Sequence, residues 1–448
     1  MAVWNIVNFS SVSESLRFDA EHYQPAYLEN IAFLQGGCAW PVVPLRNKLL
    51  SISGGATPSG ADYPIDGIPF LRVQNIMSGY LEVSNVEFIS EHTHLKELAR
   101  SRVQPGDVLL TITGMSYGKA THVTAELGEA NINQHSVRMA FQSDLLPEYV
   151  ATYLNCRYGK LQSDMLVTGI TRPALNYEDI RGMLIPLLPL DKQVQIKQLV
   201  YDAESARKLA STSYAEAEAL LLHALQLDKL APAAKTYTAP FSDFTRTLRL
   251  DAQYYQPRYR QTLARLGQNG LTVGSVAQPV RSRFRPVPGT TFQYLEIGGL
   301  LDGGRVEPEP VAAEDAPSRA QTVLQAGDVV TSSVRPIRRL TGFIGPAQGG
   351  TVGTSGFIAL RPTAVAPEVL TVYLRLPIVC EILDLYTTAT MYPTVTEADV
   401  LGLPFPALSA AVQADSVRLV QAGFAARQRA TELLDEAKRR VEEFIQTA

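Results

Sequence analysis

An internal repeat is the feature that most constrains how this chain of 448 residues can fold. The segment LRFDAEHYQP at 16–25 returns as LRLDAQYYQP at 248–257. QPGDVLLTIT, which begins at Gln104, returns as QAGDVVTSSV from Gln325, and the surroundings of Pro173 have a weaker counterpart around Pro393. The matches occur in the same order, at separations of 232, 221 and 220 positions. This pattern indicates a tandem duplication.

Each copy ends in a segment with helical periodicity. Residues 189–227 contain no internal Gly or Pro, and their small and apolar residues recur in steps of three and four. Residues 408–445 show the same pattern. A helix of some 35 residues is roughly 50 Å long at about 1.5 Å per residue. Because equivalent surfaces of duplicated units meet about a two-fold axis, we expect the two helices to pair as an antiparallel coiled coil.

Between the arm and the long helix, each copy mixes strand and helix signals. We therefore predict an α/β fold, with two tandem-duplicated α/β domains separated by a pair of long antiparallel coiled-coil helices in a pseudo-two-fold arrangement. Each repeated arm should pack on a long helix. The predicted boundaries are a helical arm at 1–30, an α/β domain at 31–188, the central helix and linker at 189–235, a second arm at 236–262, a second α/β domain at 263–406 and the C-terminal helix at 407–448.

Composition narrows the class of protein. A hydrophobic fraction of 46% and a charged fraction of 19% are typical of a globular protein. No apolar run is long enough for a membrane span, and no secretory signal is recognisable at the N-terminus, so we expect a cytoplasmic protein without membrane contact. The three isolated cysteines exclude a disulfide framework and a CxxC metal site. With a formal charge of −4, positive charge for binding DNA must be local or come from a partner.

Motifs for catalysis are few. GMSYGKAT at 114–121 superficially resembles a phosphate-binding loop, but it has three residues between its glycines where four are required, so a hairpin loop is favoured. His92 and His94 have no third metal ligand at a suitable spacing, which favours a solvated loop. Motifs for adenine methylation, dinucleotide binding and serine hydrolysis are absent from the sequence. The balance favours a binding role without catalysis or a bound cofactor.

Arginine clusters suggest where DNA would be contacted, because arginine grips phosphates and reads guanine edges with two hydrogen bonds. A surface that is merely solvated is the alternative for any single residue. In the second copy the candidate DNA-binding residues are Arg281, Arg283, Arg285, Arg335, Arg338, Arg339 and Tyr392. The corresponding places in the first copy are richer in amides and hydroxyls, and the candidates there are Arg72, Gln74, Asn75, Ser116, Tyr117, Lys119, Thr171 and Arg172.

The tandem arrangement, the GDVL and GDVV strands, the Pro-Leu-x-x-Gln start of the central helix and the RxDAxxYQP arms resemble the specificity (S) subunit of type I restriction-modification systems. The resemblance covers essentially the whole chain. It implies that the two α/β regions are target recognition domains, and that the helices set their spacing and dock methyltransferase subunits. It also implies a subunit without catalytic activity. Related S-like subunits serve bipartite type IIB systems, so the subtype stays open.

The predicted function is that of a DNA sequence-specificity subunit, which recognises a bipartite site with one half-site per domain. Its expected partners are double-stranded DNA, DNA adenine methyltransferase subunits that carry S-adenosylmethionine, and a restriction or translocase subunit as a further candidate. Two alternatives stay open. One is a restriction or modification enzyme with divergent catalytic motifs, and the other is a structural coiled-coil adaptor that makes no contact with DNA.

Overall fold

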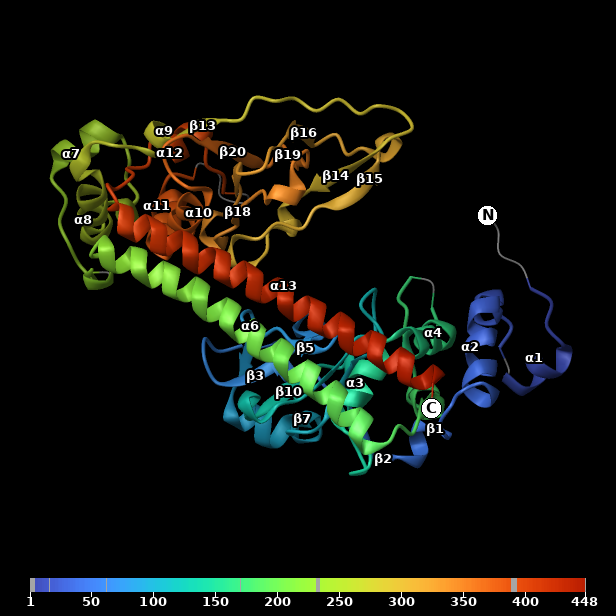
Figure 1. The fold of residues 1–448 in the computed structure, drawn as a ribbon. Coiled ribbons are helices and arrows are strands. Elements are labelled where there is room, and N and C mark those ends of the chain that lie inside the picture. Colours follow the sequence, from blue (N-terminus) through green and yellow to red (C-terminus); the bar gives the residue numbers. More distant parts are fainter. Residues whose placement is uncertain are drawn as a thin grey trace. The chain divides into compact units, whose positions relative to one another are not determined.

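The computed structural model describes residues 5–15, 17–61, 63–169, 171–230, 234–387 and 393–447. The chain forms two compact units (Figure 1). Unit 1 comprises Met1–Ala206 and Gln428–Ala448, and unit 2 comprises Arg207–Arg427. Two long helices, α6 (Leu190–Ala224) and α13 (Ala410–Gln446), each contribute one part to both units. The domain boundaries suggested by the sequence therefore stay a prediction, because the units divide both helices.

The remaining elements of unit 1 are α1 (Phe9–Ser15), α2 (Pro25–Gly36), β1 (Val42–Pro44), β2 (Leu49–Gly54), β3 (Ile68–Leu71), β4 (Ile76–Met77), β5 (Tyr80–Leu81), β6 (Glu87–Ile89), β7 (Arg102–Val103), β8 (Val108–Thr111), β9 (Ala120–His122), β10 (Ala130–Ile132), β11 (Ser136–Phe141), α3 (Pro147–Asn155), α4 (Arg157–Leu166), α5 (Tyr177–Gly182) and β12 (Leu184–Pro186). Those of unit 2 are α7 (Phe241–Thr247), α8 (Pro257–Leu266), α9 (Val273–Val276), β13 (Ala277–Pro279), β14 (Thr291–Leu295), β15 (Glu309–Ala312), β16 (Ala320–Val323), β17 (Val329–Ser332), β18 (Thr341–Phe343), β19 (Val352–Thr354), β20 (Phe357–Pro362), α10 (Pro367–Arg375), α11 (Pro377–Leu385) and α12 (Glu397–Leu401).

Both units contain two four-stranded sheets with the same strand order. In unit 1 the orders are β2-β11-β8-β9 and β6-β3-β10-β7. In unit 2 they are β13-β20-β17-β18 and β15-β14-β19-β16. One parallel pair, β3 with β10 and β14 with β19, occupies the same place in each second sheet. The matching topology confirms the predicted duplication and the α/β class.

The repeated Gly-Asp of the two copies builds the same local structure twice. Asp107 accepts a backbone N–H three residues before it at 2.7 Å and lies 3.2 Å from the Arg138 guanidinium. Asp328 accepts the equivalent N–H at 2.8 Å and pairs with Arg361 at 2.8 Å. Both carboxylates are buried, so each needs these partners to offset its desolvation. The motif fixes the turn that leads into β8 and β17.

The arms are also alike in the two units. The guanidinium of Arg17 binds both carboxylate oxygens of Asp19 at 2.6 Å, and Arg249 binds Asp251 in the same way at 2.8 and 2.7 Å. In each arm the motif tyrosine donates its hydroxyl hydrogen to the carbonyl oxygen of that arginine. Hydrogen bonds within each arm therefore explain why the same residues recur in both copies of the arm motif.

The expectation that the arms pack on the long helices agrees with the cores, because Leu34 of α2 shares a hydrophobic cluster with Val441 of α13, and Leu266 of α8 shares one with Leu221 of α6. Arg17 donates to the carbonyl oxygens of Leu166 and Val167 at 3.3 Å, and so caps the C-terminal end of α4. In the second arm, Arg258 of α8 pairs with Glu381 of α11 at 2.5 Å. Each arm is therefore also held by an arginine to a shorter helix of its own unit.

Within each unit the two long helices lie side by side and run antiparallel, as predicted (Figure 1). In unit 1, Ile196 shares a hydrophobic cluster with Val441, and Ala203 shares another with Ala430. In unit 2, a Cβ on Gly423 would stand 3.1 Å from the carbonyl oxygen of Ala210, so the helices approach closely there. The predicted pseudo-two-fold symmetry concerns the placement of the units and stays a prediction.

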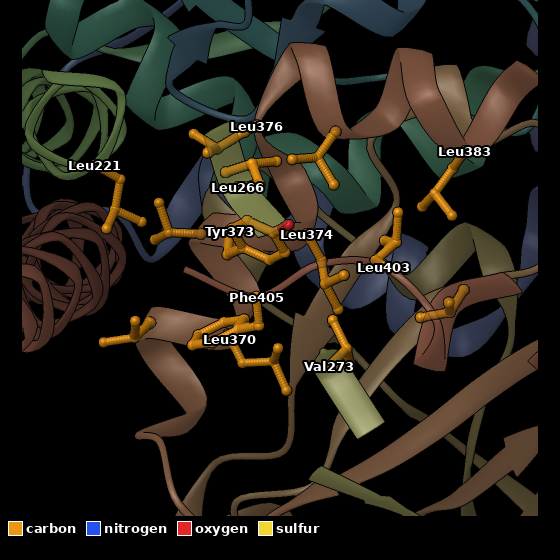
Figure 2. Packing of buried hydrophobic residues seen from close by; sticks show 14 of the residues in the cluster. Leu221, Leu266, Val273, Leu370, Tyr373, Leu374, Leu376, Leu383, Leu403 and Phe405 are labelled. Carbon is orange, nitrogen blue, oxygen red and sulfur yellow. The ribbon is translucent and has the colours of Figure 1, made fainter. Parts of the chain in front are cut away.

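A core of apolar side chains holds the first sheet of unit 2 against its long-helix segments. Figure 2 shows its centre, where the ring of Tyr373 lies edge-on to that of Phe405. The centroids of the two rings are 5.0 Å apart. The Tyr373 hydroxyl donates to the carbonyl oxygen of Pro404, which satisfies it inside the core. Leu221 of α6 belongs to the same cluster. Among the described residues, no helix is apolar over a stretch long enough to cross a membrane.

Candidate nucleic-acid interface

In each unit, several loops lie next to one another at the same end of the strands of the first sheet. In unit 1, β2 and β8 both run antiparallel to β11, so they are parallel to each other and end on the same side. The start of β11 lies there as well. The loops at this place are 55–57, 112–119, 133–136, 168–169 and 171–174, and we call them the loop edge of unit 1.

Backbone hydrogen bonds tie these loops together. The N–H of Ile112 donates to the His135 carbonyl, and the N–H of Gly114 donates to the Pro173 carbonyl, both at 2.9 Å. The β8–β9 hairpin loop therefore touches both the start of β11 and the segment after α4. The structure thus brings together five of the predicted residues, namely Ser116, Tyr117, Lys119, Thr171 and Arg172.

Arg172 and Thr171 are exposed at the loop edge of unit 1. A terminal nitrogen of Arg172 lies 3.1 Å from Nε2 of His135. Burial, and then the positive charge of Arg172, lower the pKa of His135. The lowered pKa favours the neutral form of His135, whose ring offers hydrogen bonds rather than a charge. Gln134, beside it, is exposed as well.

Tyr117 and Ser116 are partly committed to the fold. The Tyr117 hydroxyl donates to Asp164 at 2.8 Å, and the Lys160 ammonium lies 4.4 Å from the centre of its ring. Burial first, and this hydrogen bond second, raise the pKa of Tyr117. The carbonyl of Ser116 accepts the hydroxyl of Thr111 at 2.5 Å. DNA contact by these two residues stays a prediction.

The turn Val73–Asn75 starts beside the same edge, because the N–H of Asn133 donates to the carbonyl of the residue before Arg72. Gln74 is exposed, whereas Asn75 is only 2% exposed. The side chain of Asn75 accepts the Arg72 N–H at 2.9 Å and donates to backbone carbonyls. Arg72 itself pairs with Glu87 at 3.2 Å. Asn75 is thus used to hold the turn.

The loop edge of unit 2 consists of 280–283, 333–340, 354–357 and 393–396. The N–H of Ser333 donates to Gly356 at 2.9 Å, and the N–H of Arg335 donates to Pro393 at 2.8 Å. These bonds repeat the pattern of unit 1. Tyr392, predicted to contact DNA, lies outside the described residues.

The arginines of unit 2 differ in their exposure. Arg335 and Arg338 are exposed, with Ile337 between them at 51% exposure. Arg339 is engaged inside the protein, since its Nε donates to the Arg375 carbonyl at 2.7 Å and its guanidinium pairs with Glu218 of α6. The structure therefore separates a cluster that looks uniform in the sequence.

Arg281, Arg283 and Arg285 are all exposed. Arg281 binds Glu397, with a bond of 2.8 Å from one of its two terminal nitrogens, and this hydrogen bond lowers the pKa of Glu397. The backbone of Arg283 forms an isolated antiparallel β-bridge with that of Thr322 in β16. The segment after β13 therefore runs from the first sheet to the second. The ion pair with Glu397 links Arg281 to the segment 393–397, and the N–H of Arg335 donates to Pro393 of the same segment.

Other sequence interpretations can be judged as well. The stretch around Gly114 and Gly118 is the hairpin loop between antiparallel strands β8 and β9, as predicted. The solvated loop expected at His94 is wrong, because His94 is 2% exposed and its Nδ1 lies 2.5 Å from Oδ1 of Asn131. In the described part of the chain, no group of three or more metal-binding side chains is found.

Some residues of the two edges are not marked by any motif in the sequence. His135 and Gln134 precede β11 in the same way as residues 354–356 precede β20. Aligning the two copies would have placed them at the edge. Glu397 and Glu218 are acidic residues on helices, and nothing in the local sequence marks them as partners of arginines.

Together these features define a class: a tandemly duplicated protein whose two α/β units share a pair of long antiparallel helices and each present a polar loop edge. The solved structures that are similar over more than 90% of this chain include S subunits of type I restriction-modification systems. One is the HsdS subunit from Thermoanaerobacter tengcongensis, at 18% identity and a TM-score of 0.31, covering 92% of this chain and 97% of that one. Another is the S subunit from M. genitalium, at 10% identity and a TM-score of 0.42, covering 92% and 96%.

A third similar chain comes from a structure of the type I restriction-modification system that concerns complex assembly and conformational transition. Its identity is 16% and its TM-score is 0.32, with 91% of this chain and 97% of that one covered. No protein-family model and no curated protein matches the sequence.

Proposed function

We propose that this chain is the DNA sequence-specificity subunit of a restriction-modification or adenine-methylation complex, and that each unit reads one half-site. The observation that carries the proposal is the loop edge, which occurs once in each unit and presents exposed donor groups on loops fixed by a sheet. Base edges are read by such donors when a rigid scaffold positions them. Arg172 in unit 1 and Arg335 in unit 2 represent the two edges.

The two edges differ in chemistry, and so should the two half-sites. In unit 2 four arginines are exposed at the loop edge, namely Arg281, Arg283, Arg335 and Arg338, and arginines suit guanine edges and phosphates. In unit 1, Gln134, Thr171 and neutral His135 accompany a single exposed arginine, Arg172. Amides and hydroxyls pair with adenine and with mixed acceptor patterns. The full site is therefore asymmetric.

Catalysis belongs to a partner in this proposal. A methyltransferase subunit carries S-adenosylmethionine and methylates adenine, and a restriction or translocase subunit joins the complex. In unit 1, Leu190, Val194 and Tyr201 of α6 are exposed at 57, 50 and 38% and follow helical spacing. Large apolar side chains left exposed along one stripe are typical of a protein-binding surface. This stripe supports docking of the partner on α6.

The isolated chain is expected to bind duplex DNA weakly and with a shallow dependence on salt, because its net charge is −4 and its basic clusters are only local. Adding the methyltransferase subunit should tighten binding and steepen the salt dependence. Titrations of a labelled duplex at several salt concentrations measure both, and mapping of methylated adenines in the assembled complex identifies the site. Full affinity of the lone chain, or methylation by it, would contradict the proposed division of labour.

Replacing Glu397 by Gln is expected to strengthen binding to all duplexes alike. Arg281 is held by this half-buried carboxylate, so the change frees a guanidinium for a phosphate. The fold should tolerate the change, because ion pairs at the surface contribute little stability. The salt slope of log K should steepen by about 1. The control is Glu309→Gln, an equal charge change at the exposed first residue of β15. An equal effect of both variants would show that Arg281 does not contact DNA.

A further inference from the structure

The hairpin loop between β17 and β18 has an unusual backbone. Arg335 and Arg339 both adopt left-handed conformations, with φ of 51° and 59°. The equivalent loop of unit 1 has glycine at both places, where Gly114 and Gly118 have φ of 81° and 79°. A side chain with a Cβ is strained in this region, whereas glycine is not. The second copy therefore carries two arginines where the loop itself favours glycine.

A network of buried hydrogen bonds holds the strained end of this loop. Arg375, at the end of α10, is 5% exposed and donates to the Arg339 carbonyl at 2.6 Å. Its Nε donates to the Tyr214 hydroxyl of α6 at 2.7 Å. The Arg339 guanidinium in turn binds the Arg375 carbonyl and Glu218 of α6. Both ends of Arg339 are thus fixed to α6 and α10.

The positive charges of the two arginines in this network stabilise the negative charge of Glu218. Burial raises the pKa of Glu218, and the positive charges of Arg339 and Arg375 counteract that effect. The side chains of Glu218 and Arg339 are 18 and 32% exposed, so their ion pair is only partly screened by water. Removal of Glu218 would leave the guanidinium of Arg339 without its carboxylate at a partly buried place.

The first copy has no such network. The residue that corresponds to Arg375 is Asn155, whose amide donates to the Ala120 carbonyl at 2.6 Å. On α13, the places of Tyr214 and Glu218 are taken by Leu434 and Lys438. The network therefore accompanies the arginine-bearing loop and is absent beside the glycine loop, among the residues that the structure describes.

We propose that Glu218 and Arg375 are positioning residues, which hold the strained 335–339 loop so that Arg335 and Arg338 point at one half-site. This inference rests on the proposed function. The loop is fixed at its other end by the bond from the Arg335 N–H to Pro393. A side chain of long helix α6 thus contributes to the specificity of unit 2 without touching DNA. Donors must be held within a fraction of an ångström to discriminate bases.

The test measures discrimination by the assembled complex, as the ratio of methylation rates on the cognate duplex and on duplexes with one changed base. Glu218→Ala is expected to lower this ratio on the order of tenfold at the half-site read by unit 2. The ratio at the other half-site should not change. Glu216→Ala is the matched control, since Glu216 lies exposed on the same helix. Thermal unfolding of each variant shows whether the fold is kept.

A second change distinguishes positioning from mere stability. Adding Arg339→Gly to Glu218→Ala removes the unpaired guanidinium and lets the backbone adopt its left-handed conformation without strain, as Gly118 does. The ratio should recover in this double variant. If Glu218 only stabilised the fold, the added glycine would raise the melting temperature without restoring the ratio, and the inference would fall.

The outcomes separate this inference from the function on which it rests. Suppose that Arg335→Ala with Arg338→Ala changes discrimination while Glu218→Ala does not; the positioning role is then overturned and the proposed function stands. If the double arginine variant changes nothing at either half-site, the function of the loop edge fails. Should Glu218→Ala not fold, Glu218→Gln decides, because it keeps the shape and removes the charge.

Discussion

Replacing Arg335 and Arg338 together by alanine is expected to abolish most discrimination at one half-site and to spare the other. Both side chains are exposed on a loop that hydrogen bonds fix at Pro393 and at Arg375. A lost contact to a base costs about 1–3 kcal/mol, so two such contacts correspond to a loss of roughly 30-fold or more. This is the largest single effect that we expect from surface substitutions in unit 2.

Methylation of duplex libraries by the assembled complex measures this effect position by position. The pattern also identifies the kind of contact, because losing a phosphate contact weakens all sequences alike and lowers the salt slope by about 1. Arg418→Ala is the matched control, an exposed arginine of α13 whose only neighbouring carboxylate in the described structure is that of Asp415. An equal loss at both half-sites would show that the loop is not part of an independent reading head.

The repeat could be read from the sequence because it is preserved in contiguous stretches. The Gly-Asp turn and the RxDAxxYQP arm depend on contacts within a few positions of each other, such as Arg17 with Asp19. The strand order could not be predicted in the same way. Strands of two to six residues carry little pattern, and their partners are far apart in the sequence, as with Val137 and Gly54.

The candidate residues are separated by long-range contacts that the sequence does not reveal. Arg335, Arg338 and Arg339 look equivalent in the sequence, but Arg339 is bound by Glu218, 121 positions away, and by Arg375, 36 positions away. His94 likewise looks like part of a solvated loop in the sequence, but Asn131, 37 positions later, packs against it. Composition points to residue types that suit the proposed DNA-binding edge. Tertiary structure decides which of them are exposed.

The structure explains two glycines of the hairpin loop whose role the sequence does not show. The spacing of the motif around Gly114 argues against a phosphate-binding loop and leaves its two glycines without a role. The structure gives the reason for both glycines, since each adopts a positive φ in a hairpin. In the second copy Arg335 and Arg339 adopt the same left-handed conformations, and the hydrogen bonds of Arg375 and Glu218 hold Arg339 in place. Unit 2, whose hairpin loop has the strained backbone, is also the unit whose edge carries more exposed arginines.

Lengthening both long helices between the units is expected to widen the unspecified gap between the half-sites. Helices α6 and α13 each pass without interruption from one unit to the other. Four residues inserted after Ala206 and four after Arg427 would add about 6 Å to each helix and rotate the residues beyond each insertion by about 40°. With a rise of about 3.4 Å per base pair, the preferred gap should grow by one or two base pairs.

The insertion points are chosen because the contacts within each unit lie on either side of them. Ala203 with Ala430 in unit 1, and Ala210 with Gly423 in unit 2, keep their partners when both helices are lengthened together. An insertion after Ala206 alone is the control, and it should impair assembly, since it shifts one apolar stripe against the other. Methylation mapping on duplexes with graded gaps reads the result. Altered half-site bases with an unchanged gap would contradict the role of the helices as a ruler, because only the loop edges should determine the bases and only the helices the distance between them.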